Sequence, residues 1–285
     1  MIRPMAELPE HVRLVIFDLD GVVYRGSEPV HGARELIAWL HASGVAVRFA
    51  TNNSTVARSG YVERLAAMGI STSEAEVVTS TTATIEHLHR HAPDVHRVLA
   101  VGAAGMREEL AAAGFEVRMA DEIDPSAPRA AVEGFDAVLV GLDPRVDYRR
   151  LSVAMAAVAA GARLIATNAD ARYPTPAGFM PGAGAIVAAL AVATGSTPEV
   201  IGKPSPAMFT AILESSGVPA AESVVVGDNP DADVAAARRA GIAVILVLTG
   251  VADAAAASAL SGELVPTAIA EGPGGVRELL EGRVT

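Results

Sequence analysis

The chain has 285 residues, enough for one large domain or two ordinary ones, and 51% of them are hydrophobic. Its net charge of −11 argues against binding to nucleic acids or to anionic membranes, both of which depend on clustered lysine and arginine. The sequence has no cysteine, which excludes disulfides and thiolate metal sites and fits a reducing compartment.

Short apolar runs alternate with helical patterns along the chain. Residues 14–17 predict a buried strand, and the spacing of apolar residues from 33 to 40 predicts an amphipathic helix that ends at Gly44. Further strands are expected at 45–50, 98–101, 137–141, 163–167, 223–226 and 243–248, and further helices at 55–68, 80–91, 184–194, 205–216 and 231–240. This alternation indicates an α/β fold with a Rossmann-like core built on a mainly parallel sheet.

Two segments suggest domain boundaries. One is the Gly- and Pro-rich stretch 174–184, and the other is the Ser/Thr cluster 79–84. The residues between them carry strands and helices of their own. We therefore expect a core domain formed by residues 1–80 and 181–285, with an inserted α/β domain at 81–180. The alanine-rich tail 251–285 predicts no particular structure.

No segment has the pattern of a targeting or membrane-spanning sequence. The N-terminal residues contain no apolar run of signal-peptide length, and no stretch approaches the roughly 18 apolar residues of a membrane span. We expect a cytoplasmic protein that binds neither membrane nor nucleic acid.

Two aspartates, Asp18 and Asp20, follow the first strand directly in the segment DLDG at 18–21. Side chains two residues apart in a strand point the same way, so both carboxylates would face the crevice where open α/β sheets bind ligands. Such a pair can share a cation and can act as nucleophile and proton donor. The alternative is a solvated turn that caps the next element.

Polar donors follow the second strand in the segment TNNS at 51–54. Their hydroxyl, amide and backbone groups could hold a phosphate at a helix start, although the same residue types are ordinary helix caps. Lys203 lies in a loop between a glycine and a proline. Its ammonium could hold a phosphoryl oxygen and a nucleophile together, whereas the alternative is an ordinary surface lysine.

Acidic residues are concentrated after the strand at 223–226, in the segment GDNPDAD at 227–233. Three acids so close together suggest oxygen ligands for a divalent cation, and the alternative is an acidic helix start that favours the helix dipole. The four stretches together supply a nucleophile, a donor cradle, a cation and a metal-binding cluster. Their joint occurrence favours the chemical interpretation over four unrelated caps and turns.

The four stretches resemble, in order, the four motifs of the haloacid dehalogenase superfamily of phosphatases: DLDGV at 18–22, TNNS at 51–54, the lysine of GKP at 203, and GDNPDAD at 227–233. TNNS, the GKPS loop, TNAD at 167–170 and PGAGA at 181–185 are similar to the NagD and p-nitrophenylphosphatase branch. The resemblance implies a large α/β cap between the second and third motifs, in agreement with the expected insert.

By matching position, the resemblance implies that Asp18 is the nucleophile, which forms an aspartyl-phosphate, and that Asp20 is the general acid and base. Asp20 must be protonated during the attack, so we expect neighbouring acids to raise its pKa. The phosphoryl oxygens would be bound by Thr51, Asn52, Asn53 and Lys203. The substrates would be small phosphate monoesters: glycerol phosphate, 2-phosphoglycolate, a nucleoside monophosphate, a sugar phosphate or pyridoxal phosphate.

The resemblance also implies a Mg²⁺ cofactor. Asp18, Asp228 and the backbone carbonyl of Asp20 would hold the ion, while Asp233 and Asn229 would support these ligands from outside. The cap would select the substrate and could form a homodimer. Cap side chains that could reach the leaving group are Arg129, Arg145, Arg172, Tyr173 and Phe179, each of which is also an ordinary surface or packing residue.

Three other functions stay open at this point. A phosphotransferase or mutase would use the same aspartyl-phosphate with a different acceptor. A non-catalytic protein that binds phosphorylated metabolites would have no need of both Asp18 and Asp20. A glycosyltransferase with a D-x-D motif would need neither the TNNS segment nor Lys203.

Overall fold

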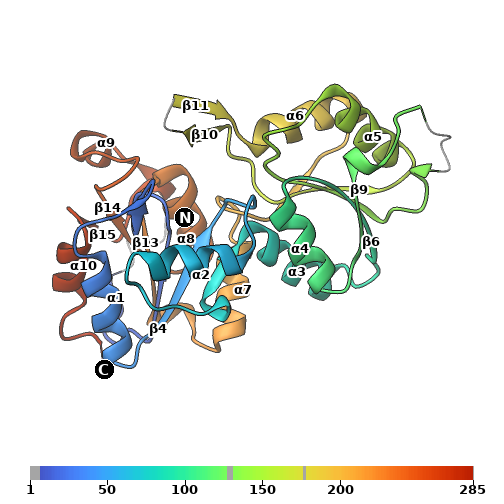
Figure 1. Cartoon of the computed structure of the whole chain (residues 1–285). Coiled ribbons are helices and arrows are strands. Elements are labelled where there is room, and N and C mark those ends of the chain that lie inside the picture. Colours follow the sequence, from blue (N-terminus) through green and yellow to red (C-terminus); the bar gives the residue numbers. More distant parts are fainter. Residues whose placement is uncertain (1–6, 127–130, 176–177, 285) are drawn as a thin grey trace. The chain divides into compact units, whose positions relative to one another are not determined.

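The computed structural model describes residues 7–126, 131–175 and 178–284, and the chain divides into two compact units (Figure 1). The first unit comprises Met1–Thr51, Tyr61–Val78 and Lys203–Thr285, and the second comprises Asn52–Gly60 and Thr79–Gly202. Each unit has helices packed on a parallel sheet, which confirms the expected α/β class. Within the described ranges, no helix is long and apolar enough to cross a membrane.

The sheet of the first unit has the strand order β15-β14-β13-β1-β4-β5. Its strands are β1 Leu14–Phe17, β4 Ala46–Thr51, β5 Val77–Thr79, β13 Ser223–Gly227, β14 Ala243–Val247 and β15 Ala268–Ala270. All residues of β1, β13 and β14 are buried, as expected for strands covered on both faces. Since β1 pairs in parallel with both β4 and β13, the segments that follow these three strands begin at the same edge of the sheet.

Helices cover this sheet, and two of them, α1 and α10, pack side by side in Figure 1. The helices are α1 Ala33–Ala42, α2 Arg58–Ala67, α7 Ala207–Ser216, α8 Ala235–Arg239, α9 Ala254–Ser258 and α10 Pro273–Leu280. Short helical turns lie at Glu74–Glu76, Ala220–Glu222, Pro230–Val234 and Gly262–Leu264. A small hairpin is formed by β2 Tyr24–Arg25 and β3 Glu28–Pro29. Phe17 of β1 shares a buried cluster with Leu36 of α1 and Val276 of α10. The tail at 251–285, for which the sequence predicts no particular structure, therefore contributes to the core of the first unit.

The sheet of the second unit has the strand order β12-β9-β8-β6-β7, and its pairings are parallel. Its strands are β6 Arg97–Val101, β7 Glu116–Met119, β8 Ala137–Val140, β9 Arg163–Ala166 and β12 Glu199–Val200; its helices are α3 Ser80–His91, α4 Ala104–Ala112, α5 Tyr148–Ala159 and α6 Ala183–Thr194, with a turn at Ala120–Glu122. An antiparallel hairpin joins β10 Arg172–Thr175 to β11 Gly178–Pro181.

The end of the second unit lies at Gly202 rather than at the expected residue 180. Ile186 and Leu190 of α6 pack into the same buried cluster as Val138 of β8, and β12 pairs with β9. Residues 183–202 therefore belong to the second core. The Gly- and Pro-rich stretch 174–184, which predicts a boundary, instead contains the β11 strand and the start of α6, both inside this unit.

Candidate active site

Asp18 and Asp228 meet where two neighbouring strands end. Asp18 follows β1 and Asp228 follows β13, and the backbone N–H of Asp18 donates to the carbonyl of Val226 at 2.9 Å. One carboxylate oxygen each of Asp18, Asp228 and Asp233 lies within 4.8 Å of the other two. The parallel pairing thus brings together acids that are more than two hundred residues apart in the sequence.

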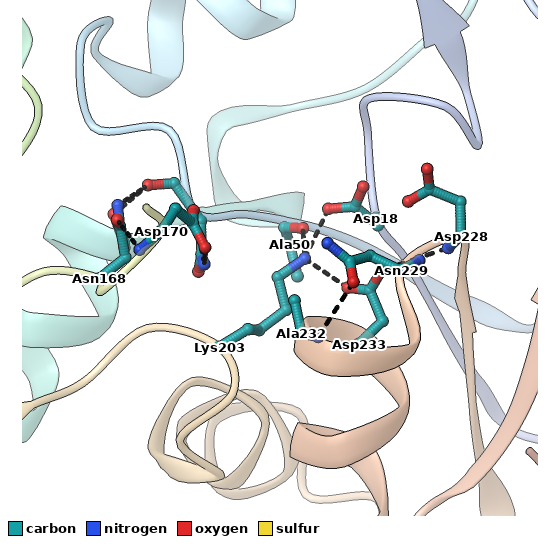
Figure 2. Close-up of polar contacts among 11 residues, drawn as sticks. Asp18, Ala50, Asn168, Asp170, Lys203, Asp228, Asn229, Ala232 and Asp233 are labelled. Carbon is teal, nitrogen blue, oxygen red and sulfur yellow. Dashed lines mark hydrogen bonds and ion pairs between the residues drawn. The ribbon is translucent and has the colours of Figure 1, made fainter. Parts of the chain in front are cut away.

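Lys203 lies among these acids, as Figure 2 shows. Its Nζ donates to Oδ1 of Asp18 at 2.5 Å, to Oδ1 of Asp233 at 2.7 Å and to the carbonyl of Ala50 at 3.1 Å. The residue is only 2% exposed. Burial alone would lower the pKa of Lys203, but the charges of Asp18 and Asp233 outweigh it and raise that pKa, so the ammonium stays charged.

Asp233 supports this arrangement through both of its oxygens. While Oδ1 accepts from Lys203, Oδ2 accepts from the backbone N–H groups of Asp228 at 3.2 Å and Asn229 at 3.1 Å. The side chain of Asn229 in turn caps the following turn, where its Oδ1 accepts from the N–H groups of two later residues at 3.0 and 3.3 Å. Gly227 makes this approach possible, because a Cβ there would lie 2.3 Å from Cβ of Asp233.

Asp228 is held against two glycines. Its Oδ2 accepts from the N–H of Val251 at 2.7 Å, and a Cβ on Gly250 or on Gly21 would lie 1.7 or 2.4 Å from that oxygen. Burial, together with the charge of Asp233, raises the pKa of Asp228 to about 7. Burial also raises the pKa of Asp18 well above its usual value, although Lys203 acts in the opposite direction.

Asp20 lies two residues beyond Asp18, in the turn where Gly21 has a φ of +82°. The residue is exposed, yet the protein atoms packed around its carboxyl group raise the pKa of Asp20, and the positive charges of Arg64 and Lys203 oppose this rise. Desolvation is therefore the cause of the raised pKa, not the neighbouring acids that we expected.

The three polar residues at the end of β4 and directly after it have different surroundings. Thr51 is the buried last residue of β4 in the first unit. Asn52 and Asn53 group with the second unit, where the amide of Asn52 donates to both carboxylate oxygens of Asp170 at 3.0 and 3.2 Å. Oδ1 of Asn53 accepts from the N–H and hydroxyl of Thr55 at 2.9 and 2.7 Å, which forms an Asx-turn.

Most of the expected cap side chains make ordinary contacts. The guanidinium of Arg172 lies 5.7 Å from the ring of Phe179, which is 71% exposed, and the backbone N–H of Arg145 donates to Asp143. Tyr173 lies on β10 of the hairpin, and Arg129 lies outside the described residues.

Asn168 and Asp170, for which the sequence predicts no role, contact the TNNS segment. The amide of Asn168 donates to the backbone carbonyl of Asn52 at 2.6 Å. Both residues belong to the TNAD segment at 167–170, which the sequence marks only through its resemblance to the NagD branch.

Comparison with known proteins gives consistent results. A family model described as haloacid dehalogenase-like hydrolase matches residues 15–116, and a second, described as HAD-hydrolase-like, matches residues 200–272. An acid sugar phosphatase of Staphylococcus epidermidis is 35% identical over 242 residues, which are 85% of this chain and 88% of the relative.

Solved structures of similar proteins include two named phosphatases and NagD. The 4-nitrophenylphosphatase of Thermotoga maritima has a TM-score of 0.83 and 30% identity, covering 94% of this chain and 97% of its own. NagD of E. coli has a TM-score of 0.80 and 30% identity, covering 92% and 97%. A glycerol phosphate phosphatase of Mycobacterium tuberculosis, solved in complex with magnesium, has a TM-score of 0.82 and 32% identity, covering 96% and 78%.

Proposed function

Because the chain belongs to the haloacid dehalogenase-like hydrolases, among the phosphatases related to NagD and the p-nitrophenylphosphatases, we propose that it cleaves small phosphate monoesters in a magnesium-dependent reaction at Asp18. The class of enzyme, a phosphoric monoester hydrolase, is that of its named relatives. The metal, the residue roles and the substrate are proposed from the site.

The observation that carries the proposal is the buried ammonium of Lys203 between Asp18 and Asp233, beside Asp228. When ionised, three carboxylates and one ammonium leave two net negative charges, which a divalent cation would balance. Carboxylate oxygens suit Mg²⁺. Asp18 Oδ2 and Asp228 Oδ1 take no hydrogen bond from the described residues, so they are suitable ligand atoms, while both oxygens of Asp233 already accept from N–H groups.

Asp18 would attack the phosphorus atom in line with the bond to the leaving alcohol, forming an aspartyl-phosphate as that P–O bond breaks. Mg²⁺, when bound, would offset negative charge on the phosphoryl group. Lys203 would hold the Asp18 carboxylate in one orientation and would neutralise charge that a phosphate dianion brings to it. Thr51 and the residues after it would bind phosphoryl oxygens.

Asp20 would donate a proton to the departing alcohol and then take one from the water that cleaves the aspartyl-phosphate. A carboxyl group can perform the first step only when protonated, and the raised pKa of Asp20 favours that state. The water returns Asp18 to its free carboxylate and releases inorganic phosphate.

The substrate is proposed from the names of the relatives, which are an acid sugar phosphatase, a 4-nitrophenylphosphatase and a glycerol phosphate phosphatase. These favour sugar phosphates and glycerol phosphate over the other candidates. The second unit would act as the cap that selects among them. A cytoplasmic location and a homodimer formed through that unit stay predictions.

Turnover of p-nitrophenyl phosphate tests the chemistry. We expect activity with Mg²⁺, its loss in EDTA and its recovery on adding Mg²⁺, and no activity for Asp18→Asn with an unchanged circular dichroism spectrum. Full activity of Asp18→Asn would contradict the role of Asp18 as the nucleophile. Activity that is insensitive to EDTA would contradict the requirement for Mg²⁺. A panel of phosphorylated metabolites ranked by kcat/KM identifies the substrate, and product analysis separates water from another acceptor, as in a phosphotransferase.

A further inference from the structure

Asn168 and Asp170 follow β9 in a segment that the proposed mechanism does not use. Asn168 is 3% exposed, and its amide donates to the carbonyl of Asn52 at 2.6 Å. Asp170 accepts from the amide of Asn52 through both oxygens. The backbone N–H of Asp170 donates to Oδ1 of Asn168 at 3.2 Å (Figure 2). The two side chains therefore hold both the backbone and the side chain of Asn52.

Glycines permit the close packing around the contact between Asp170 and Asn52. The N–H of Gly184 donates to the carbonyl of Asp170 at 2.9 Å, and a Cβ on Gly182 would lie 2.1 Å from that carbonyl oxygen. A Cβ on Gly202 would lie 2.7 Å from Oδ1 of Asn52. A larger residue at position 182 would displace Asp170, and one at position 202 would displace Asn52. The PGAGA segment at 181–185 therefore helps to fix the position of Asp170.

The contacts also set the direction of the peptide that follows Asn52. Its carbonyl accepts from Asn168 and from the hydroxyl of Ser80, at 2.6 and 2.7 Å. In a trans peptide the N–H points opposite to the C=O, so these two donors turn the N–H of Asn53 the other way. The side-chain amide of Asn52 donates to a carboxylate, so the backbone N–H of Asn53 and the hydroxyl of Thr51 are the phosphate donors that we assign to this segment.

We propose that Asn168 and Asp170 are positioning residues that orient Asn52 and the peptide after it for phosphate binding. This inference rests on the proposed function. Both residues would act through Asn52 and not by contact with the substrate. Their chemistry is complementary: a neutral amide donates to the carbonyl, whereas a carboxylate accepts from the side chain. Turning the donor at position 168 into an acceptor should therefore disturb the orientation of Asn52 without changing the size of the side chain.

The test compares Asp170→Ala, Asn52→Ala and the double variant by KM and kcat for p-nitrophenyl phosphate and by Ki for inorganic phosphate. We expect Asp170→Ala to raise the Ki about tenfold, as the loss of a charged hydrogen bond would. The same substitution should have no further effect in the Asn52→Ala background, because effects transmitted through one residue are not additive. Equal effects in both backgrounds, or an unchanged Ki, would overturn the inference.

Two isosteric variants cover the case in which an alanine variant unfolds. Asp170→Asn keeps one acceptor and should recover most of the phosphate affinity, whereas Asn168→Asp turns a donor into an acceptor facing a carbonyl and should lose it. The opposite order contradicts the proposal. Asp94→Asn, which removes a carboxylate paired with Arg163 on the surface of the same unit, is the control and should match the wild type.

Failure of this inference is distinguishable from failure of the proposed function. An active wild type with an inactive Asp18→Asn, but an unaltered Asp170→Ala, overturns only the positioning role. A wild type without phosphatase activity overturns the function, and the inference with it.

Discussion

Lys203→Met would remove the ammonium from among Asp18, Asp228 and Asp233 while keeping a side chain of similar length. Nζ lies 2.5 and 2.7 Å from its two carboxylate partners, and Coulomb's law gives about 6 kcal/mol for each pair at an effective dielectric constant of about 20. Burial of the charges offsets much of this attraction. Removing one partner of a buried pair costs about 3–5 kcal/mol, and we expect that decrease in the free energy of unfolding without metal.

The decrease should grow with pH. Lys203 lowers the pKa of both Asp18 and Asp228, so these pKa values rise further in the variant. A carboxyl group whose pKa is higher in the folded than in the unfolded chain contributes stability below its unfolded pKa and loses it as the pH rises through its folded pKa. We therefore expect a small deficit at about pH 5 and a large one at about pH 8.

Urea denaturation in EDTA, followed by circular dichroism, measures the deficit. Arg13→Met is the matched control, because Arg13 pairs with Glu222 at 2.8 Å on the surface of the same unit and such exposed pairs contribute about 0–1 kcal/mol. Lys203→Met should also lower kcat about a hundredfold or more. A deficit no larger than that of Arg13→Met, or one independent of pH, would refute the role assigned to Lys203.

Three further results are expected. Gly250→Ala should weaken Mg²⁺ binding about tenfold or more in a calorimetric titration, because its Cβ displaces Oδ2 of Asp228; wild-type affinity would contradict the packing argument. Mg²⁺ affinity should rise between about pH 6 and about pH 8, because the pKa of Asp228 is about 7 without metal and protons compete for that ligand; equal affinities would count against Asp228. Asp20→Asn should slow hydrolysis of glycerol phosphate much more than that of p-nitrophenyl phosphate, whose leaving group needs little protonation; equal slowing would argue against Asp20 as the acid.

The strands that carry the site could be predicted because their signals are local. The apolar run 14–17 is β1, and the run 223–226 is all but the last residue of β13, so the sequence alone is enough to expect the carboxylates that follow them at strand ends. Asp233 is a similar case, since the motif at 227–233 already implied a supporting role for it.

What escaped prediction depends on contacts between distant segments. Asn52 and Asp170 are 118 residues apart, and no local pattern connects an amide to a particular carboxylate. Gly250 lies at the head of the alanine-rich tail, where its role against Asp228 shows only in three dimensions. The boundary at 202 was missed because α6 is apolar on most sides, and its sequence does not say which of two cores it packs against.

Lys203 is the only lysine among the 22 lysine and arginine residues of the chain. An ammonium directs its hydrogens around a single atom, which suits two carboxylates and a carbonyl, whereas the planar guanidinium of arginine does not. A chain that otherwise uses arginine thus has one side-chain primary amine, and it is buried and kept protonated. Acylating reagents react with neutral, accessible amines, so a lysine adduct in the mass spectrum would count the molecules in which this site has opened.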